Sequence, residues 1–153
     1  MACQSVVGLA APAGLCEKAE TNYFSCETPS KQLIGLCGAS PLRPQYRFRT
    51  PAHLEVNFPE PDSVAADNFS LARSARYQTD LVEVAFVHLG SEFTLFDYRE
   101  GNNREAGVRV ATPKRDELEL RCSGAITGGL GALRSLLPCD MNSALTGGRC
   151  PNY

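Results

Sequence analysis

The stretch LVEVAFVHLGSEFTLFDY, residues 81–98, indicates the fold class. Its first half alternates apolar and other side chains, a period of two that is typical of a β-strand with one face in a core. Gly90-Ser91 then supplies a turn, and residues 92–98 return as a second strand. The residues of the first strand expected to share one face are Val82, Val84 and Phe86.

Outward from this hairpin, short β-prone runs recur about every 8 to 12 residues between turn residues. The predicted strands cover residues 22–27, 32–37, 45–49, 53–58, 81–89, 92–98, 107–111 and 116–122. The run 69–77 is ambiguous. The pattern predicts an all-β fold, an antiparallel barrel or sandwich of about eight strands.

The chain changes character after the last predicted strand. Residues 123–131 are rich in glycine and are interpreted as a flexible connector rather than a phosphate loop, because they lack the Lys-Ser/Thr ending of that motif. Leucines at 130, 133, 136 and 137 have helical spacing, and Pro138 ends the predicted short helix. We expect one β domain over residues 16–153, with a helical or loop extension from about residue 123.

Composition limits the function classes. The chain has 153 residues, 43% hydrophobic and 21% charged, which is enough for one packed core. A net charge of −2 argues against a nucleic-acid binder held by bulk charge. No run of about 18 apolar residues is present, so no transmembrane helix is expected.

The seven cysteines of the chain indicate the cellular compartment in which it is expected to fold. They lie at positions 3, 16, 26, 37, 122, 139 and 150. None has C-x-x-C spacing and only His53 and His88 could assist, so we expect no structural metal and no cofactor. Widely spaced cysteines in a small chain indicate disulfides formed in an oxidising compartment.

The hairpin 22–37 constrains the cysteine pairing. Placing Glu27 opposite Gln32 puts Cys26 opposite Leu33, with Cys37 roughly 13 Å further along the same face, beyond the reach of a disulfide of about 7 Å. Among the 15 connectivities open to six cysteines, the hypothesis is Cys16–Cys37, Cys26–Cys122 and Cys139–Cys150. Cys3 is left over.

Residues 1–15 are interpreted as an N-terminal tail or a signal remnant. Ala11-Pro12-Ala13 has the small-x-small form of a signal-peptidase site, although a basic region before it is missing. Cys3, followed by Gln4-Ser5, is alternatively a candidate lipid anchor. A plain disordered tail is the third interpretation, and all three agree with a periplasmic or secreted protein.

No catalytic constellation is evident. His53 and His88 both fall in strand patterns, and no G-x-S-x-G motif is present. The carboxylate pairs Glu117/Glu119 and Glu60/Asp62 are interpreted as solvated surface. We therefore expect a protein that is not an enzyme.

Arginine is the more informative residue type. Twelve of the fifteen basic residues are arginines, and this side chain is enriched at protein interfaces together with tyrosine. The hypothesis is a contact surface for a protein partner. Its candidate residues are Arg47, Arg49, Arg99, Glu100, Arg104 and Glu105.

Five runs of the sequence carry a resemblance to a known family: Leu15-Cys16, Tyr23-Phe24-Ser25-Cys26, Lys31 to Cys37, Gln45 to Phe48 and Leu54 to Pro59. With the late Leu120-Arg121-Cys122, they resemble a family of small exported proteobacterial proteins over roughly residues 15–122. This chain departs from the family pattern at Arg49, where glycine is usual, and in the added Cys139/Cys150 tail. The resemblance implies export and β architecture, and no activity.

A second likeness is architectural. Periplasmic lysozyme inhibitors and envelope immunity proteins are similar small, disulfide-stapled β domains, although the inhibitors' Ser-Gly and Tyr loop motifs are not matched here. We expect an inhibitor or immunity protein directed at a cell-envelope hydrolase. The alternatives are a small-ligand carrier that uses the barrel interior, a structural envelope protein and, last, an enzyme.

Overall fold

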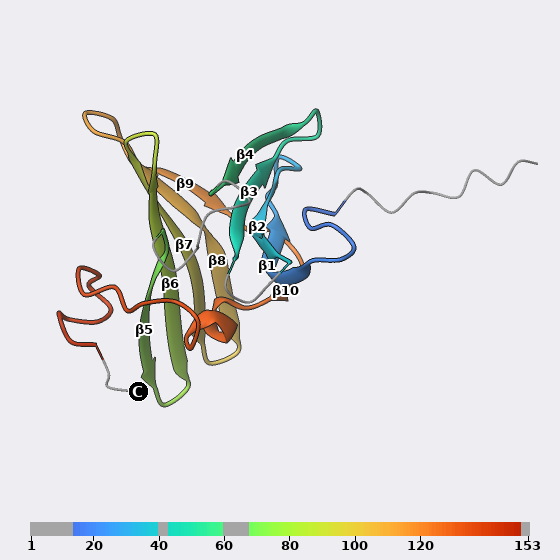
Figure 1. Ribbon diagram of the computed structural model, residues 1–153. Coiled ribbons are helices and arrows are strands. Elements are labelled where there is room, and N and C mark those ends of the chain that lie inside the picture. The colour runs from blue at the N-terminus through green and yellow to red at the C-terminus, as the bar shows by residue number, and fades with distance from the viewer. Residues whose placement is uncertain (1–13, 40–42, 60–67, 151–153) are drawn as a thin grey trace, which may run out of the picture.

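The computed structural model describes residues 14–39, 43–59 and 68–150, which form two five-stranded antiparallel sheets (Figure 1). The first sheet has the order β10-β1-β2-β3-β4, and the second has the order β5-β6-β7-β8-β9. The first-sheet strands are β1 (Thr21–Glu27), β2 (Leu33–Gly38), β3 (Gln45–Arg49), β4 (Leu54–Phe58) and β10 (Ile126–Gly128). The second-sheet strands are β5 (Ser70–Arg76), β6 (Thr79–His88), β7 (Ser91–Glu100), β8 (Asn103–Ala111) and β9 (Leu118–Arg121). The predicted all-β class is confirmed, and the ambiguous run 69–77 is β5.

The quoted hairpin forms the centre of the second sheet. Val84 on β6 lies opposite Leu95 on β7, and both side chains are fully buried. Val82 and Phe86, two positions to either side, are buried as well. The alternation therefore points this face of β6 into the core, as predicted.

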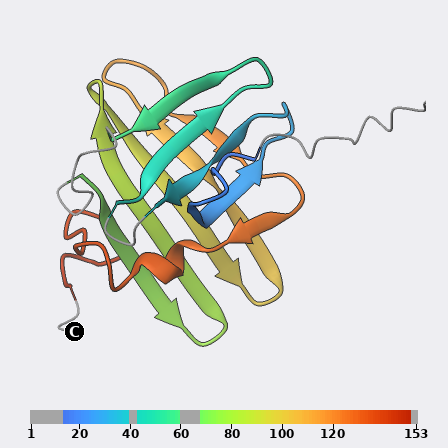
Figure 2. The same cartoon turned by 45° about the vertical axis from the view of Figure 1, so that its right-hand side comes forward.

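The two sheets pack face to face with their strands crossing (Figure 2). Apolar side chains fill the space between them. The largest fully buried ones include Tyr46, Phe24, Phe69, Ile34, Leu36, Leu95 and Leu130. The second sheet is the longer, and its β5–β6 and β7–β8 turns project beyond the first sheet (Figure 1).

The chain passes from one sheet to the other directly after β9. Cys122 N donates to Ala106 O in the second sheet, and Ser123 N donates to Glu27 O in the first. Strand β10 then pairs with β1. The segment predicted as a flexible connector is thus partly a strand, because its backbone completes the edge of the first sheet.

Three disulfides join the cysteine pairs named by the sequence hypothesis: Cys16–Cys37, Cys26–Cys122 and Cys139–Cys150. The hairpin register behind that hypothesis was wrong by one residue. Cys26 lies opposite Ile34, not Leu33, because Thr28 rather than Glu27 closes the turn through a hydrogen bond to Gln32. A bulge in β1 then leaves Cys37 opposite Asn22, so Cys26 and Cys37 remain apart.

The predicted C-terminal helix is reduced to a single 3-10 turn, η2 (Leu130–Leu133). Leu130 and Leu133 are fully buried and Leu137 is 8% exposed, so the leucine spacing does serve the core. The residue before η2, Gly129, makes no side-chain cap, and Pro138 lacks the N–H that would continue the turns beyond Leu137.

The N-terminal boundary differs from the expectation. Leu15, placed by the sequence in the tail, is 7% exposed and lies next to the Cys16–Cys37 bridge. Residues 1–13, with Cys3, and the Glu60/Asp62 pair lie outside the described residues.

Three disulfides are typical of proteins that fold outside the reducing cytoplasm. The part of the chain that the structure describes contains no helix of the length and apolarity needed to cross a membrane.

Candidate functional site

Arg47, one of the predicted contact residues, is buried. Its guanidinium forms an ion pair with Glu20, with Nη2 donating to Oε2 at 2.7 Å. The same group also donates to Leu15 O, Gln45 Oε1 and Asn57 Oδ1. Arg47 is 7% exposed and has no donor left for a partner, so the predicted contact role is wrong for this residue.

This ion pair fastens the N-terminal segment onto the outer face of the first sheet. Hydrogen bonding to the Arg47 guanidinium holds the pKa of the Glu20 carboxyl below its usual value. The Cys16–Cys37 bridge ties the same segment to β2. Arg47 is therefore a structural residue.

The predicted contact residues lie at two opposite ends of the molecule. Arg49, the last residue of β3, is half-buried beside the β3–β4 turn. Arg99, Glu100, Arg104 and Glu105 lie around the β7–β8 turn, at the projecting end of the second sheet (Figure 1). The structure thus brings four of the six together and separates the two on β3 from them.

The projecting end carries a row of charged side chains on its inner face. Asp80, Arg99 and Arg104 lie opposite one another on β6, β7 and β8. One row closer to the core, Arg73 on β5 and Asp97 on β7 flank Val82. Because these positions keep the parity of buried Val82, they face the sandwich interior rather than its outer surface.

Two bidentate pairs occupy the acidic groups of this end. Arg73 donates through Nε and Nη2 to Asp80, at 2.8 and 3.1 Å. Arg104 donates through the same two nitrogens to Asp97, at 2.9 and 3.0 Å. Both carboxylates are thus matched by the planar fork of an arginine.

Asp97 and Arg104 also fix the start of η2. Asp97 is 3% exposed and accepts a further hydrogen bond from Leu130 N at 3.1 Å. Arg104 Nη2 donates to Gly128 O at 2.8 Å, which ties β10 to the second sheet. Arg104 therefore has a structural role, and its predicted contact with a partner stays a prediction.

Among the residues that line the neighbouring cleft, Arg99 and Arg134 are the arginines that pair with no described acid. Both are exposed, and no side-chain ion pair or hydrogen bond joins either of them to a described residue. They line a cleft of about 340 Å³ together with Arg73, Asp80 and Asp97. We call this the arginine cleft; its wall on the η2 side consists of Gly129, Gly131 and Ala132.

Small residues make the arginine cleft open. A Cβ added to Gly129 would lie 2.9 Å from Arg99 Nη2 and 3.3 Å from Asp97 Oδ2. Gly129 has extended backbone, with φ of −171°, so space rather than backbone conformation requires glycine here. The guanidinium of Arg99 therefore rests against the backbone of Gly129.

The two acidic candidates at this end are surface groups. Glu100 is exposed at the β7–β8 turn. Glu105 points to the outer face of the second sheet and lies 3.6 Å from exposed Arg121. Tyr77, at the neighbouring β5–β6 turn, is 90% exposed and stands beside the same end.

The two histidines have different surroundings. His88 packs against the rings of Phe58 and Phe93, with centroid distances of 4.9 and 6.2 Å. His53 is exposed and lies 2.8 Å from Glu55. Glu117 and Glu119 lie on the exposed surface near β9. Among the residues that the structure describes, no group of three or more His, Cys, Asp or Glu is arranged to hold a metal ion.

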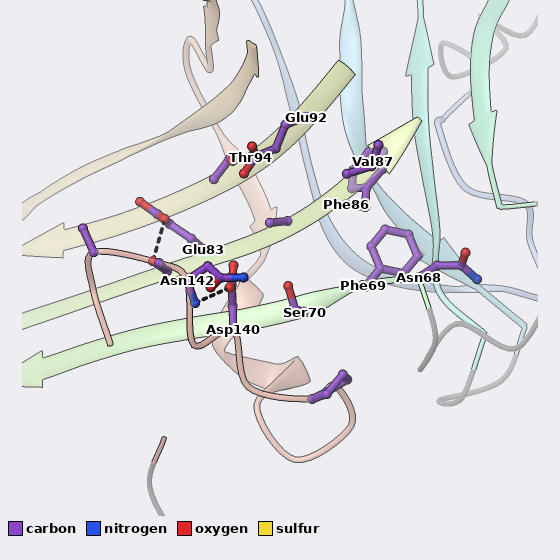
Figure 3. A pocket seen from close by; sticks show the side chains of 14 residues that line it. Asn68, Phe69, Ser70, Glu83, Phe86, Val87, Glu92, Thr94, Asp140 and Asn142 are labelled. Atoms are coloured by element: carbon purple, nitrogen blue, oxygen red, sulfur yellow. Dashed lines mark hydrogen bonds between the residues drawn. The ribbon is translucent and has the colours of Figure 1, made fainter. Parts of the chain in front are cut away.

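A second hollow of about 780 Å³ lies on the outer face of the second sheet, beneath the C-terminal segment (Figure 3). Its central carboxylate, Glu83, accepts hydrogen bonds from Tyr98, from Arg109 at 2.8 Å and from Ser143 at 3.3 Å. Burial and the bond to Glu83 raise the pKa of Tyr98. Glu83 is therefore committed to holding structure together.

The sheet brings two carboxylates to this groove from separate positions. Glu83 lies opposite Phe96, four residues along β7 from Glu92. At about 3.4 Å per residue their backbones are roughly 13 Å apart along the strands.

Sequence reasoning missed Arg134, Gly129 and the Asp97–Arg104 pair. Arg134 stood in a predicted helix and Gly129 in a predicted connector, and neither pattern indicates which way the segment packs. The sequence signal for the pair was the seven-residue spacing of Asp97 and Arg104 across a tight turn, which brings them to nearby positions on one face.

Comparisons with models of known protein families, with curated proteins and with solved structures found no match for this chain.

Proposed function

We propose that this protein is a periplasmic or secreted protein-binding module that inhibits, or confers immunity to, a bacterial cell-envelope hydrolase. It binds an acidic region of that partner through the arginine cleft and the adjoining turns of the second sheet. Support comes from one observation above the others: two arginines without a described partner line a cleft on a chain whose net charge is −2.

The balance of charge around the arginine cleft favours an acidic partner. Four guanidinium groups and two carboxylates lie in or next to this cleft, and each of the two carboxylates already accepts a bidentate arginine. Arginine suits this contact because its fork matches a carboxylate in geometry and is weakly hydrated. Glycan-cleaving hydrolases work with paired carboxylates, so their clefts offer such groups.

The shape of this end favours protein binding. The β5–β6 and β7–β8 turns project past the first sheet (Figure 1), and the first of them exposes Tyr77 almost completely. Tyrosine and arginine together are the residue types enriched at interface hot spots. Three disulfides make the scaffold costly to deform, which reduces the ordering entropy lost on binding.

A ligand inside the sandwich is less well supported. Side chains such as Phe24, Ile34, Leu36 and Leu95 are fully buried between the sheets. We therefore place the partner on the outside of the molecule and not in its interior.

The test is a pull-down from periplasmic extract with the oxidised protein as bait. We expect recovery of an envelope hydrolase whose activity falls when the pure protein is added. The double variant Arg99→Met/Arg134→Met should lose both effects. Arg115→Met/Arg149→Met removes the same charge from exposed positions outside the cleft and serves as the matched control.

Two results would count against this function. One is a bait that captures no hydrolase. The other is a hydrolase that binds and is inhibited equally by wild type and by Arg99→Met/Arg134→Met.

A further inference from the structure

We infer that the arginine cleft is a binding site for a single oxyanion, held between the guanidinium groups of Arg99 and Arg134. In the complex put forward above, the oxyanion is a carboxylate of the partner, and to that extent the inference rests on the proposed function. The site itself belongs to the free protein, so it can be tested without a partner.

The acidic side chains next to Arg99 already accept hydrogen bonds from other groups. Asp97 accepts two bonds from Arg104 and one from Leu130 N, all between 2.9 and 3.1 Å. Asp80 accepts two from Arg73. Arg99 lies opposite Asp80 and Arg104 in the sheet, yet forms an ion pair with no described residue.

The positive charges of Arg99 and Arg134 lie at one cleft. Arg99 Nη2 would lie 2.9 Å from a Cβ at Gly129, so its guanidinium lies along the η2 wall of the cleft. Arg134 caps the C-terminal end of η2 and lines the same cleft. The Arg99 guanidinium and residue Arg134 thus border one opening, and the carboxylates of that opening already accept hydrogen bonds from other arginines.

The volume of the arginine cleft fits a small anion-bearing group. The cleft measures about 340 Å³, at the lower end of the ~300–1,000 Å³ range of small-molecule sites. It has room for one carboxylate or phosphate group together with part of the molecule that carries it. Guanidinium groups recognise both anions by paired N–H···O bonds.

The experiment follows the arginine Nε–Hε NMR signals of oxidised, nitrogen-15-labelled protein during titration with sodium phosphate and, separately, sodium glutarate. We expect saturable shifts of the Arg99 and Arg134 signals, with a Kd on the order of 1 mM for these exposed groups. Arg99→Met and Arg134→Met should each weaken binding by about tenfold. Arg115→Met/Arg149→Met should bind as wild type does.

A third titration distinguishes the two sources of the oxyanion. A six-residue peptide with two adjacent glutamates should compete with phosphate for the same two signals. Tighter binding of the peptide supports a partner's acidic side chain as the natural occupant, whereas binding of phosphate or glutarate alone supports a small free anion. Absence of saturable shifts, or equal affinity in Arg99→Met, overturns the site.

The outcomes separate this inference from the proposed function. Anion binding by the free protein together with failure to capture any hydrolase removes the function and leaves the site. Capture of a hydrolase by a protein that binds none of the three anions removes the site and leaves protein binding.

Discussion

Arg47 and Arg99 occupy similar places in sequence and contrasting places in the molecule. Each lies on a strand with a neighbouring strand on both sides, and each is separated by one residue from another charged or polar side chain on the same face. Arg47 donates to four different residues and is 7% exposed. Arg99 is exposed and binds no described side chain.

The two arginines differ because the acidic side chains around them come from different places. Glu20 reaches Arg47 from a segment outside the sheet, which the Cys16–Cys37 bridge holds in place. The acids near Arg99 are claimed by Arg73 and Arg104 instead. Whether an arginine on a strand has a structural role or can contact a partner therefore depends on its neighbours in space. The alternation pattern of its own strand does not decide between the two roles.

The largest effect is expected for Arg47→Met. The substitution leaves the Glu20 carboxylate buried without its partner, which costs about 3–5 kcal/mol of unfolding free energy. Urea unfolding at neutral pH measures this loss. Arg99→Met is the matched control and should change the unfolding free energy by less than about 0.5 kcal/mol. Equal losses in the two variants would erase the distinction between the two arginines.

The second largest loss of stability is expected to differ between the two bidentate pairs at the projecting end. Asp97→Asn should cost about 2 kcal/mol, because the carboxylate is buried and accepts charge-assisted bonds that an amide cannot all replace. Asp80→Asn should cost less than about 1 kcal/mol, since its pair with Arg73 is partly solvated. Thermal and urea unfolding of the two variants, compared side by side, provide the measurement. A larger loss for Asp80→Asn would contradict this ranking.

The strands and the disulfides were the features most open to prediction from sequence. Alternation around Val84 defined both the strand and its buried face, since the two-residue period is a local property. The pairing of Cys26 survived a register error of one residue, because any nearby register leaves Cys37 too far along the strand.

The candidate site was less open to prediction because it depends on packing between distant segments. Arg47 is buried by Leu15 and Glu20, residues that the sequence assigned to no strand. Arg134 reaches the cleft because the segment after β10 forms a 3-10 turn against β6 instead of the predicted helix. Neither arrangement leaves a periodic signal in the chain.

The third effect uses pH to isolate the Arg47 pair. A Glu20 pKa below the usual 4.5 means that the unfolded chain binds the proton more readily than the folded one. The pair's contribution is therefore present above about pH 4.5 and is lost as pH falls through the folded pKa. Urea midpoints measured from pH 7 to pH 3 should fall less steeply in Glu20→Gln than in wild type. Identical slopes would show that Glu20 titrates alike in both states.

A small effect on stability, and the most direct probe of Arg99, is expected for Gly129→Ala. The extended backbone at Gly129 accepts alanine, so the unfolding free energy should change by less than about 1 kcal/mol. The new methyl group would lie 2.9 Å from Arg99 Nη2 and 3.3 Å from Asp97 Oδ2. The flexible guanidinium relieves the first contact by leaving the η2 wall, and the second requires a shift of a few tenths of an ångström. The arginine Nε–Hε NMR signal of Arg99 should shift while that of Arg47 stays unchanged. If both signals stay in place, Arg99 does not rest on Gly129, and its availability must come from free movement in solvent rather than from a position held by the fold.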